Sequence, residues 1–249
     1  MTKSNAHKFK EILNCRFSDV TEDDVIQWSE HVLSRSSKHY VATVNVAILM
    51  MMRADPKLSH YINCASLTLA DGQPIIWLSK LLKRHLPERV TGIDFMEKLA
   101  QLAAKKGKSI YIIGAKDVVL KAAIKKLKTN APDLIIAGSS NGYFSQQEAP
   151  LRIKTINESK ADILIVAMGV PLQEYFIQNH WDDLNVKLAV AVGGSLDVLS
   201  GQKSRAPLWM QVYGLEWLYR LSQEPQRLAK RYFITNSQFI YLSLKELFS

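Results

Sequence analysis

The feature that most constrains the fold is a series of short, uninterrupted apolar runs that alternate with amphipathic stretches. A strand with one face in water alternates apolar and polar residues, whereas a strand in a sheet covered on both faces is apolar throughout. The runs therefore predict strands of a fully buried sheet. Six segments have this character: Tyr40–Val44, Leu67–Ala70, Ser109–Ile113, Leu134–Ala137, Asp162–Ala167 and Leu188–Val192.

The stretches between these runs have helical periodicity. They are Gln73–Arg84, Phe95–Lys106, Val118–Asn130, Gln146–Ser159 and Leu172–Leu184. Repeated strand–helix–strand order is typical of an α/β fold with a mostly parallel, Rossmann-like sheet flanked by helices. In such sheets ligands bind beyond the carboxyl ends of the strands, so functional residues are expected in the loops that follow the strands.

The pattern changes after Gly201, where no further strand is predicted. Pro207–Ser222 has the pattern of an amphipathic helix, and a second helix is predicted from Gln226 to the end. We therefore expect an α/β body over residues 1–200 and a helical appendage over residues 201–249. The appendage mixes basic and aromatic side chains: Arg220, Arg227, Lys230, Arg231, Trp209, Tyr213, Trp217, Tyr219, Tyr232, Phe233, Phe239 and Tyr241.

Composition and spacing argue against several classes of protein. Cys15 and Cys64 stand far apart, and no histidine spacing suits a metal, so we expect no disulfide, no metal site and a reducing cytoplasm. No apolar segment follows Met1–Lys10, and the longest apolar run, Val46–Met52, is too short to span a bilayer. The net charge of +9 favours nucleic acid, anionic lipid or a diphosphate as partner, unless the chain is simply a basic protein.

Polar side chains follow the first two predicted strands. Thr43 and Asn45 end the first, and Asp71 followed by Gly72 ends the second. All three suit helix caps or turns equally well. If the loops bind a sugar, Asp71 is the natural general base for an attacking hydroxyl. Arg89, in the next loop, can pair with a phosphate or a carboxylate, or stay exposed.

Glycine-containing loops follow two later strands. Met168–Pro171 leads into Gln173 and Glu174, in the first turn of a helix whose free N–H groups can bind an anion or a nucleobase carbonyl. Gly193-Gly194 follows the next strand, and Asp197 suits ribose hydroxyls or a cap. Dinucleotide and P-loop fingerprints are absent, as is Asp-x-Asp, so a leaving diphosphate would need the arginines of the tail.

In order, these pieces resemble the WecG/TagA/CpsF family of bacterial glycosyltransferases, from about Tyr40 to Arg231. Two departures are conservative: Leu196 stands where Phe is frequent, and Ala167-Met168-Gly169 replaces the usual Gly-Leu-Gly. The closest matches are Val192-Gly193-Gly194-Ser195-Leu196-Asp197, Gly201, Arg205-Ala206-Pro207, Trp209, Gly214-Leu215-Glu216-Trp217, Arg220-Leu221, Glu224-Pro225 and Arg227-Leu228.

The resemblance implies an inverting, metal-independent transferase with no cofactor. It would move N-acetylmannosamine or its uronic acid from a UDP-sugar to GlcNAc on polyprenyl diphosphate, at the inner face of the membrane. Asp71 matches the base, and the remaining residues match binding positions. These are Thr43, Asn45, Arg89 and Gln173 in the pocket, Gly193, Gly194 and Asp197 at the nucleoside, and Arg220, Arg227 and Arg231 at the diphosphate, the first two of them catalytic.

The appendage is expected to dock on anionic lipid through its basic and aromatic side chains, or else to pack on the body as an ordinary helix pair. Three other functions stay open. One is a transferase of the same family that uses UDP-glucose or another UDP-hexose. Another is a non-enzymatic nucleotide- or nucleic-acid-binding module with steep salt dependence. The third is a nicotinamide-dependent oxidoreductase, which the missing glycine fingerprint disfavours. We favour the transferase and expect no nucleic-acid partner.

Overall fold

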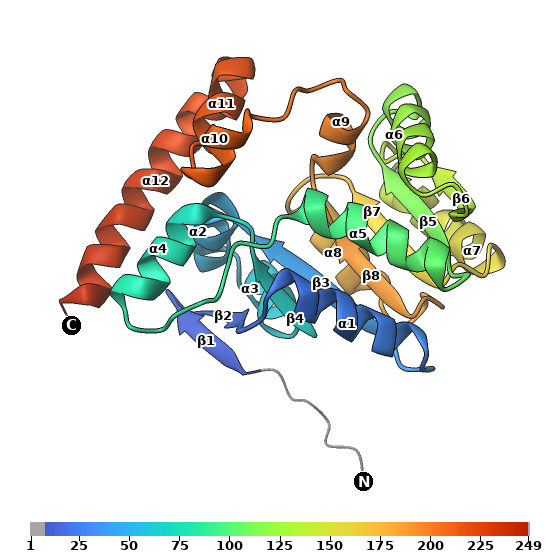
Figure 1. Cartoon of the computed structure of the whole chain (residues 1–249), viewed down its shortest axis with the longest axis horizontal. Coiled ribbons are helices and arrows are strands. Elements are labelled where there is room, and N and C mark those ends of the chain that lie inside the picture. Colours follow the sequence, from blue (N-terminus) through green and yellow to red (C-terminus); the bar gives the residue numbers. More distant parts are fainter. Residues whose placement is uncertain (1–7, 249) are drawn as a thin grey trace, which may run out of the picture. The chain divides into compact units, whose positions relative to one another are not determined.

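A computed structural model describes residues 8–248, so the first seven residues of the Met1–Lys10 segment lie outside the described part. Strands and helices alternate along most of the chain (Figure 1). The strands are β1 (Phe9–Ile12), β2 (Cys15–Ser18), β3 (His39–Val44), β4 (Leu67–Ala70), β5 (Ser109–Gly114), β6 (Ile135–Ser140), β7 (Ile163–Ala167) and β8 (Leu188–Ala191).

The helices include a short 3₁₀ turn, η1 (Gln146–Glu148), directly before α7. They are α1 (Glu22–Leu33), α2 (Val46–Ala54), α3 (Pro56–Asn63), α4 (Gln73–Leu81), α5 (Gly92–Lys105), α6 (Asp117–Asn130), α7 (Ala149–Glu158), α8 (Leu172–His180), α9 (Ser195–Leu199), α10 (Leu208–Val212), α11 (Glu216–Gln223) and α12 (Pro225–Leu247). Among the described residues, no helix combines the length and the apolar character that crossing a bilayer requires.

The predicted fold class is confirmed. Each of the six apolar runs forms a strand of one sheet, in the order β4-β3-β8-β7-β5-β6. The β3–β8, β8–β7, β7–β5 and β5–β6 pairs are parallel. Every residue of β4, β7 and β8 is buried, as their continuous apolar sequences predicted. Strands that run the same way present their carboxyl ends at one edge, where the loops with polar residues begin.

The chain divides into two compact units. The first contains Met1–Val25, Thr43–Thr91 and Ala206–Ser249, and the second contains Ile26–Ala42 and Gly92–Arg205. The C-terminal helices thus belong to the same unit as the ends of β3 and β4. The boundary expected at residue 200, between a body and an appendage, stays a prediction.

In the first unit, an antiparallel hairpin of β1 and β2 precedes the sheet. Its two turn residues, Leu13 and Asn14, both have positive φ (49° and 64°), which matches the twist of a tight hairpin. The hydroxyl oxygen of Ser18 accepts a hydrogen bond from the Thr68 N–H at 3.0 Å, which ties β2 to β4. The last turn of α12 returns to this hairpin, because the Glu246 carboxylate accepts from the Leu13 N–H at 3.2 Å and also pairs with Arg84.

The single helix predicted over Pro207–Ser222 was wrong, because α10 and α11 are separated by a turn at Gly214. Gly214 has φ +68°, and the Leu215 N–H donates to the Met210 carbonyl at 2.7 Å, a left-handed C-terminal turn. The reason for the break is close packing on α4. A Cβ at Gly214 would lie 2.6 Å from Cβ of Gln73 and 3.3 Å from the ring of Trp77. Other helices end earlier than predicted, α4 at Leu81 and α8 at His180.

Replacing Gly214 with Ala should lower the free energy of unfolding by about 2–4 kcal/mol, because the new methyl group meets both a left-handed backbone and an occupied space. The matched control is Gly201→Ala. Gly201 also has a positive φ, +78°, but nothing lies within 4 Å of an added Cβ. This control should lose only about 1–2 kcal/mol. Urea unfolding measures both variants, and equal losses would show that the approach of Gln73 does not matter.

Candidate functional site

The carboxyl ends of β3 and β4 bring together residues that the sequence placed in two separate loops. The Asp71 N–H donates to the Val44 carbonyl at 2.9 Å. An added Cβ on Gly72 would lie 3.5 Å from the Cα of Asn45. Thr43, one residue before the end of β3, is buried at 7% exposure. Asp71, Asn45 and Thr43 thus lie at one edge of the first unit.

All three of these residues had a helix cap or turn as an alternative role. For Asn45 the cap is confirmed, because its side-chain oxygen accepts from the Ile48 N–H at 3.1 Å at the start of α2. The N-cap residue of α4 is Gly72, the residue directly after Asp71.

Arg89 reaches the same edge from the loop between α4 and α5. The neighbouring Val90 N–H donates to the Ala70 carbonyl at 3.1 Å, directly before Asp71. Of the roles that the sequence left open for Arg89, the structure shows a carboxylate pair. Nη1 of Arg89 lies 3.0 Å from Oε2 of Glu216 on α11, and the side chains are only 15% and 23% exposed. Glu216 was not predicted, although it lies within the Gly214–Trp217 match.

Three predicted arginines come together on α11 and α12. Burial holds the pKa of Arg231 below its usual value, and the charges of Arg227 and Arg220 act in the same direction. The Nε atom of Arg231 is buried and has no hydrogen-bond partner. Glu224 offsets part of the charge, since its Oε2 lies 2.5 Å from Nη2 of Arg227. Guanidinium groups this close together repel one another, so the cluster suits an anion with several oxygens.

In the second unit, Gln173 joins two glycine loops at the carboxyl ends of β7 and β8. Its backbone N–H donates to the Gly169 carbonyl at 3.0 Å, and its side-chain Oε1 accepts from the Gly193 N–H at 2.9 Å. Gly169 and Gly193 have positive φ values of +79° and +57°, and no atom lies within 4 Å of an added Cβ at either position. The backbone of both loops is therefore open to close approach by a ligand.

Gly194 and Asp197 follow in the same unit. Gly194 is the N-cap residue of α9, and that cap has no side-chain hydrogen bond, so Asp197 does not cap the helix. Instead Oδ2 of Asp197 lies 3.4 Å from Nζ of Lys203. The carboxylate is about one third exposed, which leaves it accessible to a ligand hydroxyl.

Sequence analysis placed Glu174 in the first turn of a helix but assigned it no role. It is 3% exposed, and Nε2 of Gln173 donates to its Oε1 at 2.8 Å. Its other oxygen, Oε2, is buried without a hydrogen-bond partner. Burial raises the pKa of Glu174 to about 7. A charged residue in the first turn of a helix usually faces water, so the sequence gave no signal that this carboxyl is buried.

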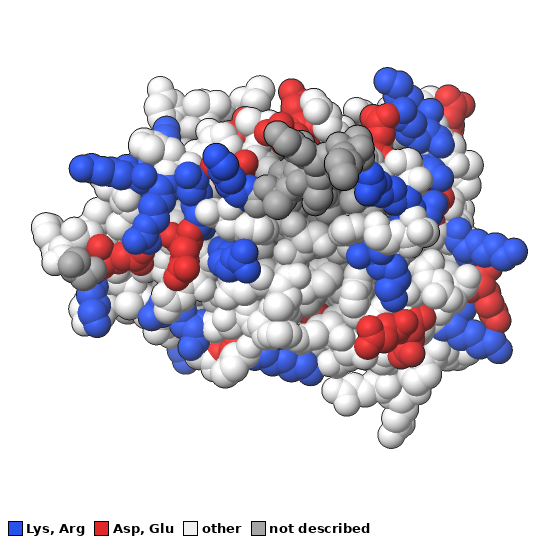
Figure 2. Space-filling model, turned by 90° about the horizontal axis from the view of Figure 1, so that it is seen from below, with Lys and Arg blue, Asp and Glu red and all other residues white. Residues whose placement is uncertain are grey.

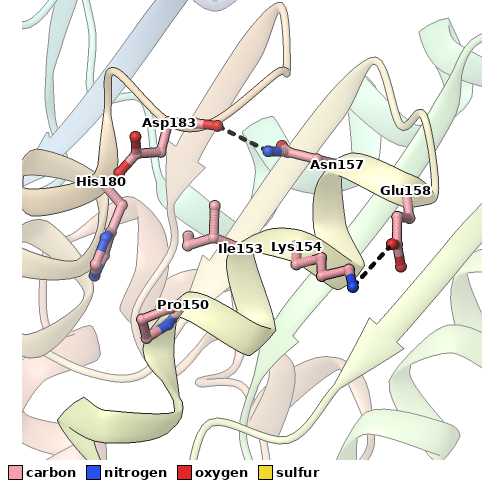
Figure 3. Close-up of a pocket in the computed structure, with 7 residues that line it drawn as sticks. All are labelled: Pro150, Ile153, Lys154, Asn157, Glu158, His180 and Asp183. Carbon is pink, nitrogen blue, oxygen red and sulfur yellow. Dashed lines mark hydrogen bonds and ion pairs between the residues drawn. The ribbon is translucent and has the colours of Figure 1, made fainter.

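A hollow of about 520 Å³ lies elsewhere in the second unit, between α7 and the end of α8 (Figure 3). Asn157 donates to the Asp183 carbonyl at 2.8 Å, and Lys154 lies 3.8 Å from Glu158. The hollow contains none of the predicted site residues. The lining residues are Pro150, Ile153, Lys154, Asn157, Glu158, His180 and Asp183.

The basic side chains are dispersed on the face that Figure 2 shows, where Lys and Arg are interspersed with Asp and Glu. Within residues 8–248, His, Cys, Asp and Glu side chains form no group of three that could hold a metal ion.

Comparison with known proteins identifies the family of the chain. The model of the glycosyl transferase WecG/TagA/CpsF family matches residues 10–249. The chain belongs to this family. The match also includes most of the β1–β2 hairpin and the part of α12 after Arg231, which lie outside the segment on which the resemblance was based. Membership of the WecG/TagA/CpsF family makes the chain a glycosyltransferase, and the non-enzymatic and oxidoreductase alternatives are set aside.

Two relatives carry the same name, N-acetylglucosaminyldiphosphoundecaprenol N-acetyl-beta-D-mannosaminyltransferase. The protein from Bacillus subtilis strain 168 is 34% identical over 198 residues, which are 80% of this chain and 77% of the relative. The protein from Bacillus spizizenii strain W23 is 31% identical over 213 residues, 84% of this chain and 82% of the relative. Arg205 is one of the residues on which the resemblance was based. Both of its terminal nitrogens donate to the carboxylate of Asp94, at 2.6 and 2.7 Å.

The buried carboxyl of Glu174 should make the stability of this family member pH-dependent. Between its usual pKa of 4.5 and the raised value of about 7, the folded chain holds a proton that the unfolded chain has released. The free energy of unfolding therefore falls as the pH rises through this range, by roughly 3 kcal/mol. In Glu174→Gln this loss is absent, so the free energy of unfolding of the variant should rise relative to that of the wild type between pH 5 and 8. Urea unfolding at four pH values measures it, and a pH-independent difference would contradict the assignment.

Proposed function

We propose that the chain moves N-acetylmannosamine, or its uronic acid, from a UDP-sugar to GlcNAc on a polyprenyl diphosphate, with inversion and without a metal. The shared name of the two relatives supports the sugar and the acceptor. The observation that carries the proposal is the placement of Asp71, which follows the end of β4 and lies beside Asn45 and the Arg89 loop.

In the proposed reaction, Asp71 accepts the proton of the acceptor hydroxyl. The hydroxyl oxygen forms a bond to the anomeric carbon from the face opposite the UDP, and the bond to the diphosphate oxygen breaks with inversion. Thr43 and the amide of Asn45 hold sugar hydroxyls or the acetamido group, with Arg89 held nearby by Glu216. A well-placed general base contributes about 10²–10⁴ in rate.

The departing diphosphate gains negative charge, which the arginine cluster is suited to offset. Arg220 and Arg227 act on the developing charge, and Arg231 offers a buried Nε that has no hydrogen-bond partner among residues 8–248. The nucleoside end is assigned to the second unit, with Gln173, Gly193 and Gly194 shaping the loops and Asp197 accepting from ribose hydroxyls. No cofactor is required.

The proposed location of the chain is a membrane surface facing the cytoplasm, to which its C-terminal helices would dock. Several large apolar side chains of α10 and α12 are exposed, among them Leu208 (78%), Val212 (72%) and Phe233 (76%). Lys230 is exposed on the same helix as Phe233. An exposed apolar surface flanked by cations suits the interface of an anionic bilayer, where a polyprenyl-linked acceptor resides.

The experiment that tests this function is mass spectrometry of the product from a short-chain polyprenyl-diphosphate GlcNAc acceptor and several UDP-sugars. A product with added N-acetylmannosamine or its uronic acid supports the proposal. A product formed only with UDP-glucose or another UDP-hexose would establish the alternative within the family.

Asp71→Asn should lower turnover by roughly 10² or more, because the amide cannot accept the proton. UDP affinity, measured by calorimetry, should stay near that of the wild type, since Asp71 is assigned to the acceptor. Near-normal turnover would remove Asp71 from the mechanism.

Arg220→Ala should reduce turnover by roughly 10²-fold with a soluble acceptor analogue, as expected for a group that stabilises developing charge.

Activity of the wild type should survive EDTA, because the arginines take the place of a metal. Loss of activity on chelation that Mg²⁺ or Mn²⁺ restores would show that the diphosphate is neutralised by a metal instead.

The double variant Leu208→Ser, Val212→Ser should weaken sedimentation with vesicles of phosphatidylglycerol while turnover of a soluble acceptor is kept. The matched control is Val118→Ser on α6, where an apolar side chain 71% exposed is changed in the other unit. Equal vesicle binding by both variants would exclude α10 from the membrane contact.

A further inference from the structure

Glu174 is a buried titratable group that the proposed mechanism does not use. It follows Gln173 in the first turn of α8, and the two side chains are 3% and 1% exposed. Burial of a carboxyl with one unpartnered oxygen costs free energy, so its presence calls for a compensating role. Its hydrogen-bond partner identifies that role, because the partner is the residue that joins the two glycine loops.

The amide of Gln173 has two possible orientations, related by a half-turn that exchanges its oxygen and nitrogen. In the observed orientation Oε1 accepts from the Gly193 N–H at 2.9 Å, and Nε2 donates to Oε1 of Glu174 at 2.8 Å. In the flipped orientation two donors would face each other at Gly193, and two oxygens would face each other at Glu174 when its carboxyl is ionised. Both contacts therefore select the same orientation.

We propose that Glu174 is a positioning residue for the nucleotide: by accepting from Gln173, it fixes the amide that holds the Gly193 loop to the start of α8. The proposal rests on the proposed function, in which Gln173 and Gly193 shape the nucleoside end. It adds Glu174, a residue two hydrogen bonds away from the loop, to the set on which donor affinity depends.

Two further observations support this role. Gly193 and Gly169, the loop residues that Gln173 contacts, are open on the side where a Cβ would stand, so an ordered loop there has room for a ligand. Burial also keeps the pKa of Glu174 near neutrality, so the acceptor carries less than a full negative charge close to loops that take an anionic nucleotide.

The test compares three substitutions of Glu174 by calorimetric titration with UDP. Glu174→Gln keeps an acceptor at the same reach and should bind UDP within about threefold of the wild type. Glu174→Asp keeps the carboxyl but withdraws it by one methylene, and Glu174→Leu removes the acceptor. Both should weaken UDP binding roughly tenfold, since a buried donor of Gln173 loses its partner. With the UDP-sugar, KM should rise by the same factor while kcat at saturation is kept.

The matched control is Gln178→Leu on the same helix, where another buried side-chain oxygen, Oε1, has no hydrogen-bond partner. This control should bind UDP as the wild type does. Losses as large in Gln178→Leu as in Glu174→Asp would overturn the proposal, and so would UDP binding by Glu174→Asp equal to that of the wild type. If Glu174→Leu does not fold, the UDP affinities of Glu174→Asp and Glu174→Gln still test the proposal.

Hydrogen exchange of the Gly193 amide separates this inference from the proposed function. Exchange should be faster in Glu174→Asp than in Glu174→Gln, with or without nucleotide. If the wild type fails to bind UDP but this order holds, the positioning role stands and the proposed donor is wrong. Equal exchange in the two variants would overturn the positioning role even if UDP binds.

Discussion

The fold depends on one constraint, that a sheet buried on both faces must satisfy its backbone hydrogen bonds within itself and leave polar chemistry to its ends. Every residue of β4, β7 and β8 is buried, and the one polar side chain along these three strands, Thr68, donates to the Ile62 carbonyl at 2.9 Å. Parallel pairing then brings the chain out of the sheet at one edge, strand after strand. The residues proposed to act on substrate, Asp71 and Asn45 in one unit and Gly193 in the other, all come directly after a strand or within two residues of its end.

In the C-terminal helices, by contrast, charged side chains are clustered. There the structure tolerates close guanidinium groups and a half-buried Arg231, an arrangement that is unfavourable without an anion. A glutamate accompanies each part of this surface: Glu216 pairs with Arg89, and Glu224 pairs with Arg227. These pairs hold cations in place without cancelling all of the charge, which suits a ligand that leaves as an anion.

The sequence predicted the six strands of the sheet, because short continuous apolar runs separated by helical patterns are typical of buried parallel strands. It did not predict the β1–β2 hairpin, since the turn uses Leu13 at a positive φ, where no turn signal exists. The break at Gly214 was also missed, because the reason for it is Gln73, which is distant in sequence. At the candidate site, Asp71, Arg89 and Gln173 were selected from their places after strands together with the family resemblance, and their roles stay predictions. The partners Glu216 and Glu174 could not be selected in this way, because an ion pair between distant segments and the burial of a carboxyl are properties of packing.

The discontinuous makeup of the first unit has a consequence for biosynthesis. This unit needs Thr43–Thr91 together with Ala206–Ser249, and the carboxylate of Glu246 contacts the turn at Leu13. A ribosome releases the chain from its amino end, so the second unit is complete in sequence well before α12 emerges. A nascent chain that has just completed the second unit therefore still lacks α11 and α12, which carry the arginine cluster and belong to the same unit as Asp71.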